Sequence, residues 1–223
     1  MNRSIPKSYL SIIVMLGAVW GFSEAGLGMG LRSCASFVSG SIMTGVALFF
    51  IAASWVVARN ILGIALLIVI TSLFKMFDAF LLSLPIQHGA VANPIFAFLM
   101  QGAAFLILIS LFNEKLKQKV KGQALMGGMA ALVAVNLFPL VRYVTGIPAC
   151  VVPGTGYPLS LYYAYVAVFF SAVTVPIGFK VGAKIKVWET KFEEAKQTRK
   201  LSYLASPVTL IVCLAIIALI RLV

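Results

Sequence analysis

The stretch from Tyr9 to Arg32, YLSIIVMLGAVWGFSEAGLGMGLR, most constrains what this chain can fold into. An apolar run of about twenty residues is long enough to cross a bilayer as a helix. Toward its end the run becomes small and polar, with Glu24 set among glycines and alanines. A carboxylate inside a membrane span costs roughly 2.5–3.5 kcal/mol on insertion scales, so such a residue normally faces protein or water. The stretch therefore predicts a spanning helix that carries a polar group for a specific purpose.

Further apolar runs of similar length follow along the chain. Its 223 residues are 61% hydrophobic and only 11% charged, which is typical of polytopic helical membrane proteins and not of soluble domains. We predict an all-α, polytopic transmembrane helical bundle that forms a single integral membrane domain over residues 1–223, with six core helices and a seventh C-terminal span. The predicted spans are 9–30, 41–58, 61–83, 94–112, 124–145, 159–179 and 203–223.

The basic residues of the connecting segments predict the orientation. Most of the 18 Lys and Arg residues fall on one side of the predicted membrane, namely Arg3, Lys7, Arg59, Lys115, Lys117, Lys119, Lys121, Lys180, Lys184, Lys186, Lys191, Lys196, Arg199 and Lys200. The other side has Arg32 and Arg221. Lys and Arg are enriched in cytoplasmic loops, so we expect the N-terminus inside and the C-terminus outside. This enrichment also accounts for the net charge of +12 without a nucleic-acid partner.

The segment 180–202 is the longest basic stretch and is predicted to be cytoplasmic. Ile185, Trp188 and Phe192 recur at helical spacing among its charges. Such a helix can lie on the anionic inner leaflet, dock a cytoplasmic partner, or simply extend the sixth span into solvent. The sequence leaves these three interpretations open.

Six polar or charged side chains fall inside the predicted spans, namely Glu24, Lys75, Asp78, Gln101, Asn136 and Arg142. At a rise of 1.5 Å per residue, all six lie at or beyond the membrane midplane toward the outside. We therefore predict a water-accessible cavity that opens outward and binds a small molecule through these residues. Lys75 and Asp78, three residues apart, can also form a structural ion pair. Arg142 is close enough to the interface to extend its guanidinium toward the headgroups.

Other residues suggest contacts within or between chains. Gly17, Gly21 and Ala25 are small residues at four-residue spacing, which lets another helix approach closely. Cys34 and Cys150 both fall in predicted outer loops, where a disulfide between them is possible. Enzyme motifs are absent from the sequence, and it offers no cluster of His and Cys residues for a metal and no motif for a cofactor. We therefore expect that the protein is not an enzyme.

Residues 9–112 carry a sequence pattern that resembles a known family. The pattern consists of the segments GAVWGFSEAGLGMGL, SGSIMTGVALFFIA and NPIFAFLMQGAAFLI, with Lys75 and Asp78 between the last two. They are similar to small bacterial and archaeal membrane proteins related to the substrate-binding S-components of energy-coupling factor (ECF) vitamin transporters. The resemblance implies a six-helix protein of a prokaryotic inner (cytoplasmic) membrane that binds a vitamin-like molecule from outside. It also implies that Gly17, Gly21 and Ala25 dock a transmembrane subunit linked to ATPases. In those families the docking residues are alanines, and the seventh span here is additional.

Two functions of different classes remain open from the sequence. The first is a substrate-binding membrane subunit of a transporter, which captures a small vitamin-like or polar molecule while other membrane subunits and ATPases supply energy. The second is a non-transporting membrane anchor or assembly subunit of a larger complex. An outward-opening cavity lined by Glu24, Lys75 and Arg142 favours the first function, whereas interlocked charges favour the second.

Overall fold

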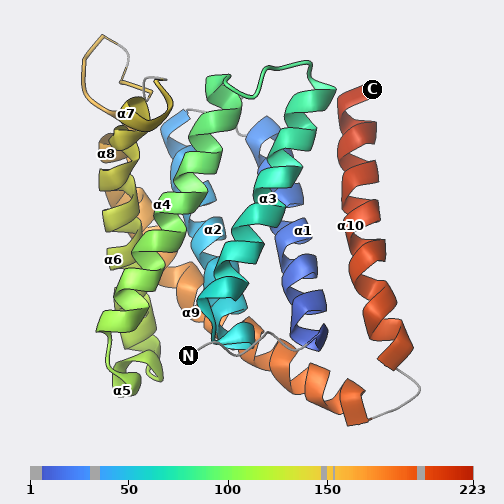
Figure 1. The fold of residues 1–223 in the computed structure, drawn as a ribbon. Helices are drawn as coiled ribbons and strands as arrows, with labels where there is room; N and C mark the ends of the chain where they lie inside the picture. The colour runs from blue at the N-terminus through green and yellow to red at the C-terminus, as the bar shows by residue number, and fades with distance from the viewer. Residues whose placement is uncertain (1–6, 31–35, 147–149, 153, 195–198, 223) are drawn as a thin grey trace.

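The computed structural model describes residues 7–30, 36–146, 150–152, 154–194 and 199–222, which form a bundle of helices (Figure 1). Apart from an isolated antiparallel bridge between Val151 and Pro158, the described elements are helical. They are α1 (Lys7–Gly30), α2 (Ser36–Ala58), α3 (Ile61–Leu81), α4 (Gly89–Leu111), α5 (Glu114–Lys117), α6 (Val120–Leu137), η2 (Phe138–Leu140), α7 (Val141–Thr145), α8 (Leu159–Tyr162), α9 (Ala164–Glu194) and α10 (Arg199–Leu222).

Seven of the described segments are long and apolar enough to cross a membrane, which confirms the predicted all-α polytopic bundle. They correspond to α1, α2, α3, α4, α6 with its extension to Thr145, α9 and α10. The side of the bundle where α1 begins and where α5 lies is called the lower side here. The opposite side, where α10 ends and α3 connects to α4, is called the upper side (Figure 1).

Among the helix starts that differ from the predicted spans, those of α4 and α9 have local reasons. Helix α4 begins at Gly89, because the side chain of His88 caps it by accepting a hydrogen bond from the Ala90 N–H at 3.2 Å. Pro94, predicted to start this span, lies inside the helix instead. The sixth span begins at Ala164, after the separate short helix α8, and continues unbroken to Glu194. The predicted basic segment is thus helical as far as the structure describes it before residue 195.

Helix α9 lies closest to its neighbours, because glycines remove the side chains that would keep the backbones apart. A Cβ atom added to Gly178 would lie 2.5 Å from the carbonyl oxygen of Phe49 in α2, and one added to Gly182 would lie 2.6 Å from that of Ala53. Gly127 in α6 faces the carbonyl oxygen of Ser171 in the same close way. Backbone approach through small residues is the usual means of helix association in membranes.

The predicted small-residue face of α1 is used within the chain. A Cβ atom on Gly17 would lie 2.9 Å from Cβ of Ile70, and one on Gly21 would lie 2.5 Å from Cβ of Phe74, both in α3. Ala25 belongs to an apolar cluster that includes Ile217 of α10. The small residues that were expected to dock a partner helix thus contact α3 and α10 of the same chain.

Helix α10 lies at the edge of the bundle beside α1 (Figure 1). Only 17% of its hydrophobic segment is buried inside the bundle, whereas 67% of the hydrophobic segment of α2 is buried. Cys213 and Ile217 form most of its buried apolar contact with α1 and α3. A helix with so little burial depends on the few specific contacts that it makes.

The close contacts of α9 predict that Gly178→Ala and Gly182→Ala destabilise the protein. The added methyl group meets a backbone carbonyl that cannot rotate away, and overfilling of this kind costs about 1–3 kcal/mol. Thermal unfolding of detergent-solubilised protein measures the effect. Gly26→Ala is the matched control in α1, because its added Cβ atom meets nothing within 4 Å. Equal melting temperatures for Gly178→Ala and Gly26→Ala would contradict the close approach of α2 and α9.

Candidate functional site

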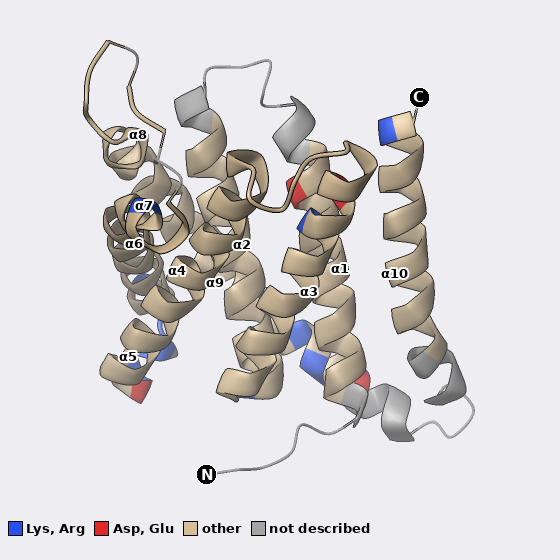
Figure 2. Cartoon of the chain, turned by 45° about the horizontal axis from the view of Figure 1, so that its top comes forward, with Lys and Arg blue, Asp and Glu red and all other residues tan. Residues whose placement is uncertain are grey.

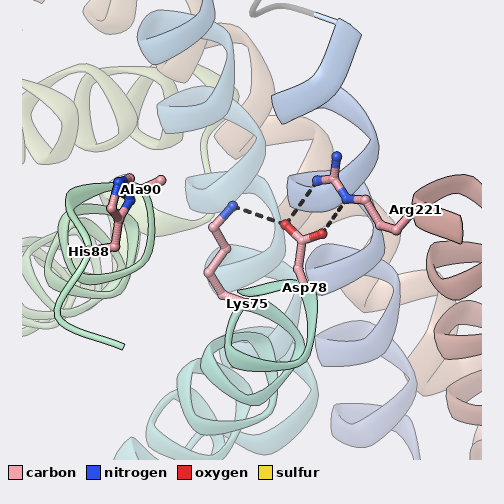
Figure 3. Close-up of polar contacts among 5 residues, drawn as sticks. All are labelled: Lys75, Asp78, His88, Ala90 and Arg221. Carbon is pink, nitrogen blue, oxygen red and sulfur yellow. Dashed lines mark hydrogen bonds and ion pairs between the residues drawn. The ribbon is translucent and has the colours of Figure 1, made fainter. Parts of the chain in front are cut away.

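The first candidate site is a group of four charged side chains at the upper ends of α1, α3 and α10, called the charged cluster here: Glu24, Lys75, Asp78 and Arg221. Asp78 is its centre (Figure 3). Arg221 donates from Nε to Oδ1 of Asp78 at 2.6 Å and from Nη2 to Oδ2 at 3.0 Å. Lys75 Nζ lies 3.5 Å from Oδ2 of the same carboxylate. Two helices are therefore joined through one aspartate.

Glu24 adds a third helix to the charged cluster. It is only 4% exposed, accepts a hydrogen bond from Trp20 Nε1 at 3.3 Å, and interacts electrostatically with Lys75. The cluster combines two acidic with two basic residues, and pairing of opposite charges offsets part of the cost of burying them. Figure 2 shows these acidic and basic positions together near the upper ends of α1, α3 and α10.

Each member of the charged cluster has a polar partner among the described residues, and the contact between Asp78 and Arg221 joins α3 to α10. The predicted pairing of Lys75 with Asp78 is present in the structure, at the long end of the ion-pair range. Arg221 was missed as a member because its place at the chain end suggested a loop residue. A basic residue in the last turn of the last span, with an intramembrane Asp on another span, is the signal that would have suggested the pair.

The second candidate site is a small cavity in the upper half of the bundle between α2, α4, α6 and the start of α9, called the Gln101 cavity here. It is lined by Thr44, Ala97, Gln101, Ala134, Val135, Phe138 and Tyr163. The centre of a water molecule can occupy about 20 Å³ of the cavity, so the cavity has room for roughly one water. None of the lining residues is charged.

Gln101 is the unusual member of this cavity. Its side chain is 6% exposed, and its Oε1 atom has no hydrogen-bond partner in the part of the chain that the structure describes. Thr44 also lines the cavity and donates its hydroxyl proton to the Gly40 carbonyl at 2.8 Å, which leaves oxygen lone pairs free to accept. The hydroxyl of Ser160, buried in α8, likewise has no partner among the described residues.

Tyr163, which lines the cavity, follows a hydrogen-bonded connection of the upper side. The Leu159 N–H donates to the Cys150 carbonyl at 2.8 Å, and the Val152 N–H donates to the Tyr157 carbonyl at 3.0 Å. This narrow hairpin leads directly into α8 and then to Tyr163, whose own carbonyl accepts from the hydroxyl of Ser41 at 3.3 Å.

The six predicted site residues do not share one cavity. Glu24, Lys75 and Asp78 meet in the charged cluster, whereas Gln101 lines the separate cavity. Asn136 and Arg142 are exposed on the outside of the bundle, and Asn136 donates to the Leu132 carbonyl of its own helix at 2.7 Å. The depth of a residue in the membrane was predicted by counting, but the direction of its side chain around the helix was not. The prediction of one outward-opening site for all six is therefore corrected.

The predicted disulfide stays a prediction. Cys150 is exposed, and Cys34 lies outside the described residues.

Comparison with known proteins gives no relative: no family model, curated protein or solved structure matches the chain. The resemblance to the S-components of ECF transporters therefore remains a prediction from the sequence.

The charged cluster predicts that Asp78→Asn destabilises the protein more than Arg221→Gln does. Loss of the aspartate removes the ion-pair partner of Arg221 and leaves Lys75 with Glu24 alone, whereas loss of Arg221 leaves Asp78 with Lys75. Breaking a buried pair costs about 3–5 kcal/mol, and the double variant should recover part of this loss. Thermal unfolding in detergent measures all three variants.

Lys117→Gln is the control for this experiment. It removes an ion pair with Glu114 on the exposed lower side, where no measurable change is expected. The shared role of Asp78 is refuted if Arg221→Gln is the more damaging variant, or if the double variant shows the sum of the two single effects.

Proposed function

We propose that this chain is the substrate-binding membrane subunit of a transporter and that it captures a small polar molecule from outside in the Gln101 cavity. The observation that carries the proposal is the buried amide oxygen of Gln101, which faces a cavity and has no partner in the described residues. The charged cluster does not serve as the binding site in this proposal. Its role is to hold α1, α3 and α10 together around the cavity-bearing helices.

A buried acceptor without a partner is costly. Leaving such a group unsatisfied costs about 1–3 kcal/mol, and an apolar residue of similar size would avoid this cost. Gln101 is inside the bundle, where leucine or methionine would fill the same space. Its presence is explained if a water molecule occupies the cavity in the resting protein and a ligand replaces that water on binding.

The lining residues limit the chemistry of the ligand. Because none of them is charged, an ion in this cavity would remain uncompensated, so the ligand is expected to be uncharged. Free lone pairs on Gln101 and Thr44 favour a ligand that donates hydrogen bonds, and the rings of Phe138 and Tyr163 supply apolar contact. Binding sites for drug-sized molecules enclose about 300–1,000 Å³, so a vitamin-sized ligand would require α8 and the hairpin before it to move.

The remaining parts of the proposal concern the surroundings of the chain. The basic residues of the lower side, including those of α5 and the lower half of α9, support a cytoplasmic location for that side, with the N-terminus inside and the C-terminus outside. The membrane is proposed to be the inner membrane of a prokaryote. Other membrane subunits, and ATPases bound to them, are proposed to supply the energy for transport.

Gln101→Leu tests the proposed site. Mass spectrometry of small molecules that co-purify with detergent-extracted protein should find a ligand with the wild type and lose it with the variant. The variant should keep the melting temperature of the wild type or exceed it, because it removes a buried acceptor without a partner. This combination separates loss of binding from loss of folding.

Asn136→Leu is the matched control, because it removes a carboxamide that is exposed on α6 and bonds only to its own helix turn. It should retain the ligand at the wild-type level. The proposed site is wrong if the ligand persists in Gln101→Leu, or if both variants lose it equally.

The second candidate function is a non-transporting anchor or assembly subunit of a membrane complex. It is favoured by the charged cluster, whose members pair with one another rather than line a cavity. In that case, purification under mild conditions should recover protein partners with the wild type and no small molecule. A retained small molecule that depends on Gln101 would exclude this function as the sole role of the chain.

A further inference from the structure

We propose that the outer face of the lower half of α9 binds the headgroup of an anionic phospholipid. This face consists of Lys180, Lys184, Val187 and Trp188, all of which are exposed. They lie at positions i, i+4, i+7 and i+8, so they form one stripe along the helix. The inference is independent of the Gln101 cavity and of the proposed transport function.

The opposite face of this half of α9 is held against the bundle, which fixes the direction of the stripe. Gly182 lies against the backbone of Ala53, and Ile185 contacts the main apolar core. Lys186 Nζ lies 5.8 Å from the centre of the Tyr9 ring, within the range of a cation–π contact. Glu189 is buried at 8% exposure. The stripe therefore faces away from the protein.

The length of α9 brings this stripe to the level of the headgroups. Its 31 residues extend about 46 Å at 1.5 Å per residue, whereas the hydrocarbon core of a bilayer is about 30 Å thick. The helix starts near the upper connections and passes beneath α1 at the lower side of the bundle (Figure 1). The lower half of α9 must therefore leave the hydrocarbon and meet the interface on that side.

The stripe has the chemistry that an anionic lipid requires. Two ammonium groups one helical turn apart can contact one phosphate, and their alkyl chains remain in the apolar layer. Trp188 is 62% exposed, and tryptophan prefers the headgroup level of a membrane. Glu189, the acidic residue next to Trp188, is turned toward the bundle, and the other two acidic residues of this half, Glu193 and Glu194, lie at the end of the helix. Charge complementarity therefore favours an anionic lipid over a zwitterionic one.

Native mass spectrometry of the full chain in a neutral detergent tests this inference. The protein is titrated separately with phosphatidylglycerol and phosphatidylcholine, and the bound lipid is counted. The wild type should bind phosphatidylglycerol more tightly. The variant Lys180→Gln/Lys184→Gln should lose about tenfold or more of this affinity, since each lysine near an anionic surface contributes about fivefold. Binding of phosphatidylcholine should stay unchanged.

Lys119→Gln/Lys121→Gln is the matched control, because it removes the same charge from exposed positions on the same side of the bundle. It should retain phosphatidylglycerol. Equal binding of the two lipids by the wild type would overturn the proposal. Equal loss of phosphatidylglycerol binding in the two double variants would also overturn it, because net charge alone would then explain the loss. Recovery of a protein partner that depends on Lys180 and Lys184, with lipid binding unchanged, would instead assign this face to a protein contact.

Discussion

Inside an apolar bundle, a polar group depends on the few partners that the chain itself brings to it, because no bulk water is present to supply them. Asp78 satisfies this constraint because it accepts hydrogen bonds from Arg221 and forms an ion pair with Lys75. Glu24 accepts a hydrogen bond from Trp20. Gln101 does not satisfy it within the described residues. The contrast separates polar groups that stabilise helix contacts, such as Asp78, from groups such as Gln101 whose buried atoms have no partner among the described residues.

The arrangement of α10 follows from the same constraint. Its apolar contacts are few, so the bidentate contact between Arg221 and Asp78 contributes much of what is specific about its position. Arg221 also neutralises the carboxylate of Asp78, whose other cationic partner, Lys75, lies 3.5 Å away. Because α10 covers Ala25 and α3 covers Gly17 and Gly21, the small residues of α1 contribute to this fold before they could serve any partner.

The seven spans could be predicted from the sequence, because long apolar runs that end in basic or Gly- and Pro-rich segments have few alternatives in a membrane. Which face of a helix looks inward was not predictable in the same way. Asn136 and Gln101 share residue chemistry and similar depth, but one is exposed and the other is buried. That difference depends on helix rotation, and close contacts between distant parts of the chain, such as Gly102 of α4 with Ile68 and Gly127 of α6 with Ser171, accompany it. The partner of Asp78 lies 143 residues away and was missed for the same reason.

The transporter and anchor functions place different demands on the Gln101 cavity. An anchor gains nothing from an unsatisfied buried amide, and at about 1–3 kcal/mol its cost is a sizeable part of the stability of a small domain. A binding subunit gains from it, because the ligand supplies the missing hydrogen bond only in the bound state. The free energy of the hydrogen bond that Gln101 lacks in the resting protein is then gained when the ligand binds. The buried amide is therefore a stronger argument for binding than the charged cluster, whose interactions are already complete without a ligand.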